Sequence, residues 1–81
     1  MTNASNAPQL KPGDKLQYHK GELWLDAIVL GKVVVMTELL VIGIDATHPE
    51  VAEMLTEQEY EGRQLKITCA AADSEKIRPP F

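Results

Sequence analysis

The stretch that decides the fold runs from Trp24 to Asp45 and reads WLDAIVLGKVVVMTELLVIGID. Its apolar residues occupy both odd and even positions, and its β-branched side chains favour strands over a helix. A strand with one face in water carries polar residues at every second position. This stretch does not, so both faces need cover from a helix, from the far side of a closed barrel or from another subunit.

Two polar or flexible pairs interrupt this apolar stretch. Gly31-Lys32 predicts a bend and Thr37-Glu38 predicts a hairpin turn. Glycine at a strand break often marks a β-bulge, and bulges let a short sheet curl. The predicted elements are a strand near 24–31, a bent or paired continuation near 32–36 and a strand near 39–45.

The residues before the apolar stretch divide into an arm and a first strand. Residues 1–13 are small and polar, so we expect a flexible N-terminal arm followed by a single β-rich domain over 14–81. A Pro-Gly-Asp turn at 12–14 leads into a predicted strand over 15–19.

The C-terminal third predicts another strand and an extended tail. Apolar and polar residues alternate over 63–71, with one side expected to be buried: Leu65, Ile67, Cys69 and Ala71. Two consecutive prolines at 79–80 cannot donate to a central ladder, so the tail should lie along an edge of the sheet.

Between these strands, the sequence Thr47-His48-Pro49-Glu50 is typical of a capping box, in which the Thr47 hydroxyl accepts from the backbone N–H of Glu50. The Glu50 carboxylate then reaches back to the N–H of Thr47. Apolar residues follow at helical spacing: Val51, Met54 and Leu55. The sequence therefore predicts one amphipathic helix near 48–60.

Composition bounds the class of protein. The chain has 81 residues, enough for one domain with a modest core. A net charge of −4 and a pI near 5.0 argue against a nucleic-acid partner. One cysteine excludes an internal disulfide, no signal peptide is apparent, and charges interrupt the apolar stretch, so we expect a cytoplasmic protein outside the membrane.

Reactive side chains are few. Asp45, His48 and Glu50 cluster near the predicted start of the helix, but their spacing does not match a helical pair of metal ligands. A turn accounts for Asp45 and capping accounts for Glu50. Cys69 falls on the apolar side of its strand, so we expect a buried, inert thiol. The sequence predicts no catalytic residue, no metal site and no cofactor.

A set of residues spread along the chain carries a family resemblance: Pro12, Gly13, Asp14, Gly21, Trp24, Ala27, Val29 and the ending Ile77-Arg78-Pro79. Their order resembles the SH3-like small barrels, particularly Tudor and Agenet-type modules. The resemblance implies an SH3-like barrel, or a strongly curled antiparallel sheet of about five strands, with the predicted helix added. It also implies a binding role.

Two further likenesses carry no activity. The pattern is similar to that of the plasmid-borne dihydrofolate reductases, which are oligomeric SH3-like barrels, but their V-Q-I-Y active-site segment has no counterpart here. In size, the chain is similar to small reading frames of mobile gene cassettes.

The methyl-lysine cages of Tudor modules need several aromatic rings, and this chain has one Trp, two Tyr and one Phe.

Four rings are the predicted binding residues: Tyr18, His19, Trp24 and Phe81. In an SH3-like barrel, the first two strands and the C-terminal tail meet, which would gather these rings for a cation–π contact or a peptide groove. Alternatively, Trp24 and Tyr18 are simply the large core residues of a small domain.

The apolar stretch also predicts self-association, because one helix covers too little of its surface. The predicted interface of a homodimer is Val33, Val35, Leu39 and Val41. The expected function is a small binding or adaptor module that acts through protein–protein contact and is not an enzyme. The alternative is a small oligomeric enzyme or ligand-binding protein whose pocket forms between subunits.

Overall fold

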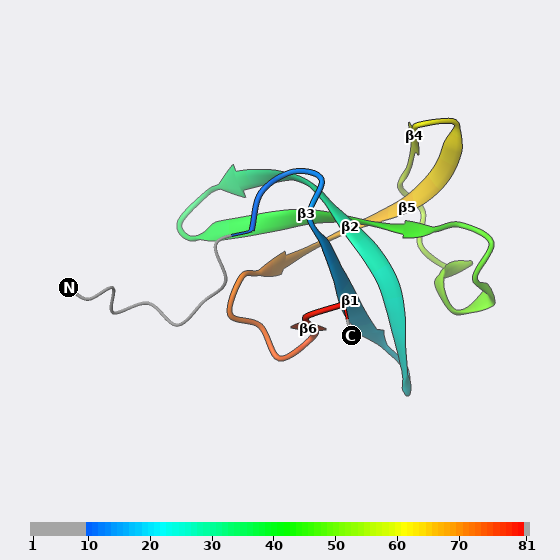
Figure 1. Cartoon of the computed structure of the whole chain (residues 1–81), viewed down its shortest axis with the longest axis horizontal. Coiled ribbons are helices and arrows are strands. Elements are labelled where there is room, and N and C mark those ends of the chain that lie inside the picture. The colour runs from blue at the N-terminus through cyan, green and yellow to red at the C-terminus, as the bar shows by residue number, and fades with distance from the viewer. Residues whose placement is uncertain (1–9, 81) are drawn as a thin grey trace.

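A computed structural model describes residues 10–80, which form an open antiparallel sheet of six strands (Figure 1). In chain order the elements are β1 (Lys15–Lys20), β2 (Leu23–Val34), β3 (Glu38–Asp45), the 3-10 turn η1 (Pro49–Val51), β4 (Glu57–Tyr60), β5 (Arg63–Ala71) and β6 (Ile77–Arg78). The strand order is β4-β5-β3-β2-β1-β6, so β4 and β6 are the edges. The expected mainly-β class is confirmed, but the described strands do not close into a barrel.

The central apolar stretch forms the long β2–β3 hairpin that crosses the molecule in Figure 1. The bend expected near Gly31 is a β-bulge. Val29 pairs with Ile42 and Gly31 pairs with Val41, which leaves Leu30 as an extra residue on β2. A bulge increases the local twist, so the hairpin curls across the core.

The expected helix over 48–60 is wrong. The chain makes one 3-10 turn, η1, and Thr47 does not cap it, because its backbone N–H and its hydroxyl both donate to Oδ1 of Asp45, at 2.9 and 2.7 Å. The apolar residues of the segment do not share a buried side: Val51, at the end of η1, is buried, whereas Leu55 is 95% exposed. Tertiary burial is what stabilises most helices, and here it is missing.

The acidic end of the same segment forms β4 instead. Residues 57–60 pair with β5 across a tight turn in which Glu61 and Gly62 have φ of 50° and 83°. Glycine adopts this left-handed conformation at little cost, so the turn favours a hairpin. The acids that would oppose a helix dipole lie here on an edge strand, where charge discourages aggregation.

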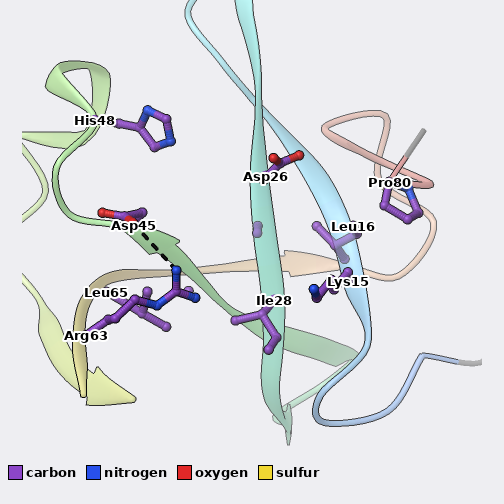
Figure 2. Close-up of a pocket in the computed structure, with 11 residues that line it drawn as sticks. Lys15, Leu16, Asp26, Ile28, Asp45, His48, Arg63, Leu65 and Pro80 are labelled. Carbon is purple, nitrogen blue, oxygen red and sulfur yellow. Dashed lines mark ion pairs between the residues drawn. The ribbon is translucent and has the colours of Figure 1, made fainter. Parts of the chain in front are cut away.

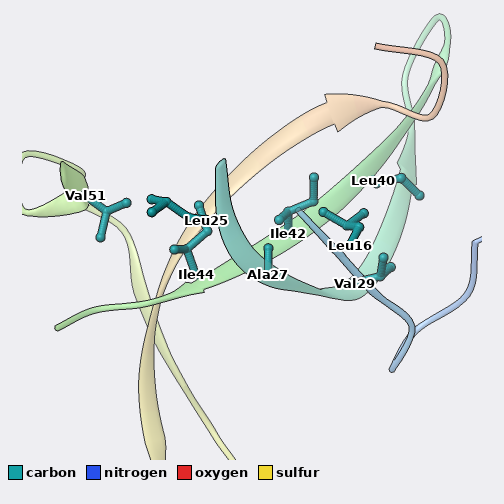
Figure 3. Close-up of a cluster of buried hydrophobic side chains, with 8 residues drawn as sticks. All are labelled: Leu16, Leu25, Ala27, Val29, Leu40, Ile42, Ile44 and Val51. Carbon is teal, nitrogen blue, oxygen red and sulfur yellow. The ribbon is translucent and has the colours of Figure 1, made fainter. Parts of the chain in front are cut away.

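One side of the sheet, the core face, carries the buried apolar cluster: Leu16, Leu25, Ala27, Val29, Leu40, Ile42, Ile44 and Val51 (Figure 3). Most of this cluster comes from β2 and β3, as the sequence suggested. Leu10, Met54 and Ile77 are half-buried against it, so chain segments rather than a helix cover this face. Residues 1–9, most of the predicted flexible arm, lie outside the described residues.

The opposite side of the sheet is the outer face. Registers place Gln17 opposite Asp26, and Ile28 opposite Gly43, on this side. Gly43 is buried because Leu65 crosses it: a Cβ at Gly43 would lie 2.7 Å from Cδ1 of Leu65. The outer face is therefore partly polar and partly closely packed.

The buried side of β5 differs from the expected one. Leu65 is buried on the outer face, but Lys66 is also buried and lies opposite Ile44 on the core face. Cys69 is exposed, so the expectation of a buried thiol is wrong. The alternation in the sequence is real, but burial follows position along β5: its first two residues are exposed, Leu65 and Lys66 are buried on opposite sides, and the residues after them are half-buried or exposed.

Candidate functional site

Three side chains from the three strands at one end of the sheet stack on its outer face. His19 on β1 lies opposite Trp24 on β2, and their rings stack with centroids 4.8 Å apart and planes inclined by 20°. The Cζ of Arg78, from β6, lies 4.1 Å from the centroid of the indole. A cation over an indole face is an electrostatically favourable contact.

Hydrogen bonds hold this arginine in place. Gln17 pairs with Arg78 across β1 and β6, and its Oε1 accepts from Nε of Arg78 at 2.8 Å. The Nε2 of Gln17 donates to Oδ1 of Asp26 at 3.1 Å, which fixes the orientation of the amide. We call these five residues the Trp24 cluster: Gln17, His19, Trp24, Asp26 and Arg78.

Within residues 10–80, no carboxylate lies within ion-pair distance of the Arg78 guanidinium. One of its faces is held by Trp24, and its Nε is held by Gln17. A guanidinium offers further N–H donors in a rigid fork that matches a carboxylate. The cluster therefore presents a fixed cation whose remaining donors are available to an acidic group.

Next to this cluster the outer face is hollowed, with a volume of about 430 Å³ (Figure 2). Its floor is apolar, from Ile28, Gly43 and Leu65, and charged groups of both signs stand around it. The charged and ring-bearing members of the rim are Lys15, Asp26, Asp45, His48, Arg63 and Pro80. Asp26 belongs to both the cluster and the hollow, so the two are continuous.

The electrostatics of the hollow are set by Asp45. The backbone N–H and the hydroxyl of Thr47 donate to its carboxylate and hold the pKa of Asp45 below its ordinary value, with smaller effects from Arg63 and His48. An Arg63 Nη1 lies 3.9 Å from Oδ2 of Asp45 (Figure 2). Asp45 therefore stays ionised, and the hollow keeps a negative and a positive side.

The predicted binding residues divide between the two faces. His19 and Trp24 come together on the outer face, whereas Tyr18 pairs with Leu25 and is half-buried against the core. Phe81 lies outside the described residues. The rings therefore do not gather as one cage among the residues described, and Arg78 occupies the face of Trp24 that an external cation would use.

Sequence reasoning missed Gln17, Asp26 and Arg78. Gln17 has no distinctive pattern around it, since it is one polar residue in an alternating strand. Arg78 could have been found, because the tail that carries it was expected along a sheet edge, and an edge beside the first strand brings it near Trp24.

The predicted interface residues lie away from this cluster, on the arm beyond the bulge. Val33 pairs with Leu39, and Val41 pairs with Gly31. This register puts the side chains of Val33, Leu39 and Val41 on the outer face. Val35 lies in the turn between β2 and β3 and is exposed.

Other chemistry is not assembled in the described part of the chain. Asp45 and His48 both line the hollow, but Glu50 is exposed outside its lining. Among residues 10–80 there is no group of three His, Cys, Asp or Glu side chains that could hold a metal ion. None of the helical turns described there has the length and apolar content to cross a membrane.

Comparison of the chain with protein-family models, with curated proteins and with solved structures gives no match. The site must be interpreted from its own geometry.

Proposed function

We propose that this protein is a small binding module that holds an extended segment of a partner protein across the outer face of β1, β2 and β6. The observation that carries the proposal is the contact between Arg78 and Trp24. Hydrogen bonds connect Arg78 through Gln17 to Asp26, which lies at the rim of the hollow. A peptide lying there would contact the Arg78 cation, then the Trp24 ring and then the hollow.

The chemistry of the cluster supports one class of partner. The free donors of Arg78 favour a carboxylate, from an acidic side chain or a chain terminus. The floor of the hollow, with Ile28 and Leu65, favours an apolar side chain a few residues away. Trp24 is half-buried, and its accessible part adds contact area, as aromatic residues do at many interfaces. We therefore propose an acidic and apolar peptide as the ligand.

The resemblance to SH3-like modules supports the same proposal. The turn at 12–14 opens β1, and β6 returns to the edge of β1 after a short connection. Such modules bind peptides in aromatic-lined grooves. The sheet is open, so a relationship to SH3-like modules is itself part of the proposal. The proposed binding role is argued from the Trp24 cluster.

Panning of a phage-displayed peptide library against the full chain tests the proposal. We expect selected peptides to share an acidic residue at a fixed distance from an apolar one. Trp24→Leu and Arg78→Gln should each weaken a selected peptide at least about tenfold, the effect expected for loss of an aromatic or arginine anchor.

Leu23→Ala is the matched control, because Leu23 is the exposed neighbour of Trp24 and points to the other side of β2. Its affinity should equal that of the original chain, and thermal unfolding should confirm that all variants fold. Peptides that bind the Trp24 and Arg78 variants as tightly as the original chain would refute this site.

A second candidate is the binding of a small ligand in the hollow, which its volume favours. At about 430 Å³ it lies in the range of small-molecule sites. A fragment screen by NMR separates the two: shifts at Ile28 and Leu65 without shifts at Trp24 support a small-ligand site, and shifts along the Trp24 cluster support the peptide site.

A further inference from the structure

The arm of the sheet beyond the bulge has an apolar outer face. The register places Val33 opposite Leu39 on β3, and Val41 opposite Cys69 on β5. Because side chains alternate along a strand, two further residues of β5 lie on the same side. We call this set the Val41 face: Val33, Leu39, Val41, Ile67, Cys69 and Ala71. No member carries a charge.

This face is open to solvent in a single chain. The exposed fraction of Val33 is 42%, Cys69 is also exposed, and the remaining four residues are half-buried. The buried core lies on the other side of the same strands, with Leu40 and Ile42. A monomeric protein rarely exposes a contiguous apolar patch beyond a few hundred Å² unless the patch binds something.

The sequence outside residues 10–80 has few large apolar side chains. Residues 1–9 read MTNASNAPQ and include one large apolar side chain, Met1. Leu10, which follows them, packs on the core face. At the other end, Phe81 follows Pro80, which lines the hollow and not the Val41 face. The described residues leave Val33 and Cys69 exposed, which favours cover by another molecule.

Charge favours a second copy of the chain over a lipid surface. A hairpin that enters an anionic membrane is usually flanked by free cations. Here the net charge is −4. Lys32 is the cation nearest the hairpin tip, and its Nζ pairs with Oε2 of Glu38 at 3.7 Å, so it is not a free cation. Two identical uncharged faces can meet without opposing like charges, although each chain is acidic overall.

The margins of the Val41 face are also open. Pairing of β2 with β1 ends at Ile28, so the part of β2 near Val33 has β3 as its one neighbour in the described sheet. Pairing of β5 with β4 covers residues 63–66, so Cys69 and Ala71 have β3 as their one neighbour there. No described strand stands in the way of a second sheet that approaches the face.

We propose that two copies of this chain pack their Val41 faces against each other as a symmetric dimer. Two sheets pack in this way at about 10 Å, with their side chains interdigitated. Such an interface leaves the Trp24 cluster accessible, because that cluster lies on the other side of the bulge, on β1, β2 and β6. It also covers the Cys69 thiol, which is exposed in one chain.

Sedimentation equilibrium of the full chain is the first test. Between about 1 μM and about 1 mM, we expect the mean mass to rise from 9.0 kDa toward twice that value. Val33→Lys should raise the dissociation constant at least about 100-fold, because it brings two like charges into the contact. Val34→Lys is the matched control: Val34 is adjacent, 72% exposed and on the other side of β2, so this variant should still dimerise.

The reaction rate of Cys69 with a thiol reagent is the second test. In the original chain, labelling should slow as the protein concentration rises, because the dimer covers the thiol. In Val33→Lys the rate should be fast and independent of concentration. Circular dichroism of each variant shows whether it is folded, so a loss of association is not confused with unfolding.

Three outcomes would overturn the proposal. One is a mass of 9.0 kDa at every concentration. Another is a dimer that Val33→Lys leaves intact and whose Cys69 stays fully reactive, which would place the interface elsewhere. The third is a monomer that co-sediments with phosphatidylcholine–phosphatidylserine vesicles, which would assign the apolar tip to a lipid surface.

Discussion

At the scale of single residues, Gly43 differs from the other glycines, at which an added Cβ would meet nothing within 4 Å. Its position in β3 lies under two leucine side chains, and an added Cβ would meet Cδ1 of Leu65 at 2.7 Å and Cδ1 of Leu30 at 3.0 Å. Leu30 reaches this place because it is the extra residue of the bulge. The bulge and the glycine therefore depend on each other.

We expect Gly43→Ala to lower the free energy of unfolding by about 1–3 kcal/mol, the usual cost of overpacking. Gly31→Ala is the control, since a Cβ at Gly31 meets nothing within 4 Å. Urea denaturation of both variants measures the difference. Equal midpoints would mean that Leu65 and Leu30 move aside freely.

A second effect at this scale concerns Asp45. Hydrogen bonds from Thr47 lower its pKa below the ordinary 3.8 in the folded chain, so the folded state releases the proton more readily than the unfolded state. The stability from these bonds is fully present above the ordinary pKa and disappears as the pH falls through the lower folded pKa.

Thr47→Val removes one of the two donors, so the pKa of Asp45, measured by carboxyl carbon NMR, should rise toward 3.8. The loss of stability should be visible at neutral pH and vanish in acid. Thr37→Val, in the exposed turn before β3, is the control and should leave this pKa unchanged. An unaltered Asp45 pKa in Thr47→Val would show that the backbone donor suffices.

At the scale of elements, Lys66 joins the connection after η1 to β5. The residue is 9% exposed. Its Nζ donates to the Met54 carbonyl at 2.7 Å and lies 2.9 Å from Oε2 of Glu57. Buried charges are stable only when they are paired and hydrogen-bonded. This one amine thus fixes a segment that has little regular structure of its own.

We expect Lys66→Ala to lower the free energy of unfolding by about 2–3 kcal/mol, because it removes a charge-assisted bond and leaves a cavity. Hydrogen exchange should increase most around residues 52–60. Lys76→Ala, at an exposed lysine, should change stability by no more than about 0.5 kcal/mol. Faster exchange spread evenly over all strands would contradict this local role.

At the scale of the whole molecule, one cluster connects the described strands other than β4. Leu16 from β1, Val29 from β2 and Ile42 from β3 belong to it, and Val51 and Ile77 bring η1 and β6 onto it. A single core of this kind usually unfolds in one cooperative step. The Trp24 cluster should therefore be lost together with the rest of the sheet.

Ile42→Val should lower the free energy of unfolding by about 1 kcal/mol, because Ile42 is fully buried. Trp24 fluorescence and far-ultraviolet circular dichroism should report the same shift, although Trp24 lies on the outer face. Ile67→Val, at a half-buried position, is the control with a smaller expected effect. Separate transitions for the two probes would mean that the β1–β2–β6 end unfolds independently.

The strands predicted at 15–19, 24–31, 39–45 and 63–71 lie within β1, β2, β3 and β5, because alternation, β-branching and turn residues are local signals. The helix prediction failed where the local signal was short. The Thr47 hydroxyl could accept a hydrogen bond from the Glu50 N–H or donate one to Asp45. In the structure it donates to Oδ1 of Asp45. The burial of Lys66 could not be predicted, since it depends on the Met54 carbonyl and Glu57 arriving from another segment.

The sequence by itself determined a small, acidic, mainly-β chain with most of its core between Trp24 and Asp45, because those properties follow from composition and periodicity. Tertiary structure alone decided which side of each strand is buried. It also placed Arg78 on Trp24, although 54 positions of the chain separate them. Strand pairing sets both, since register between distant segments assigns every side chain to a face.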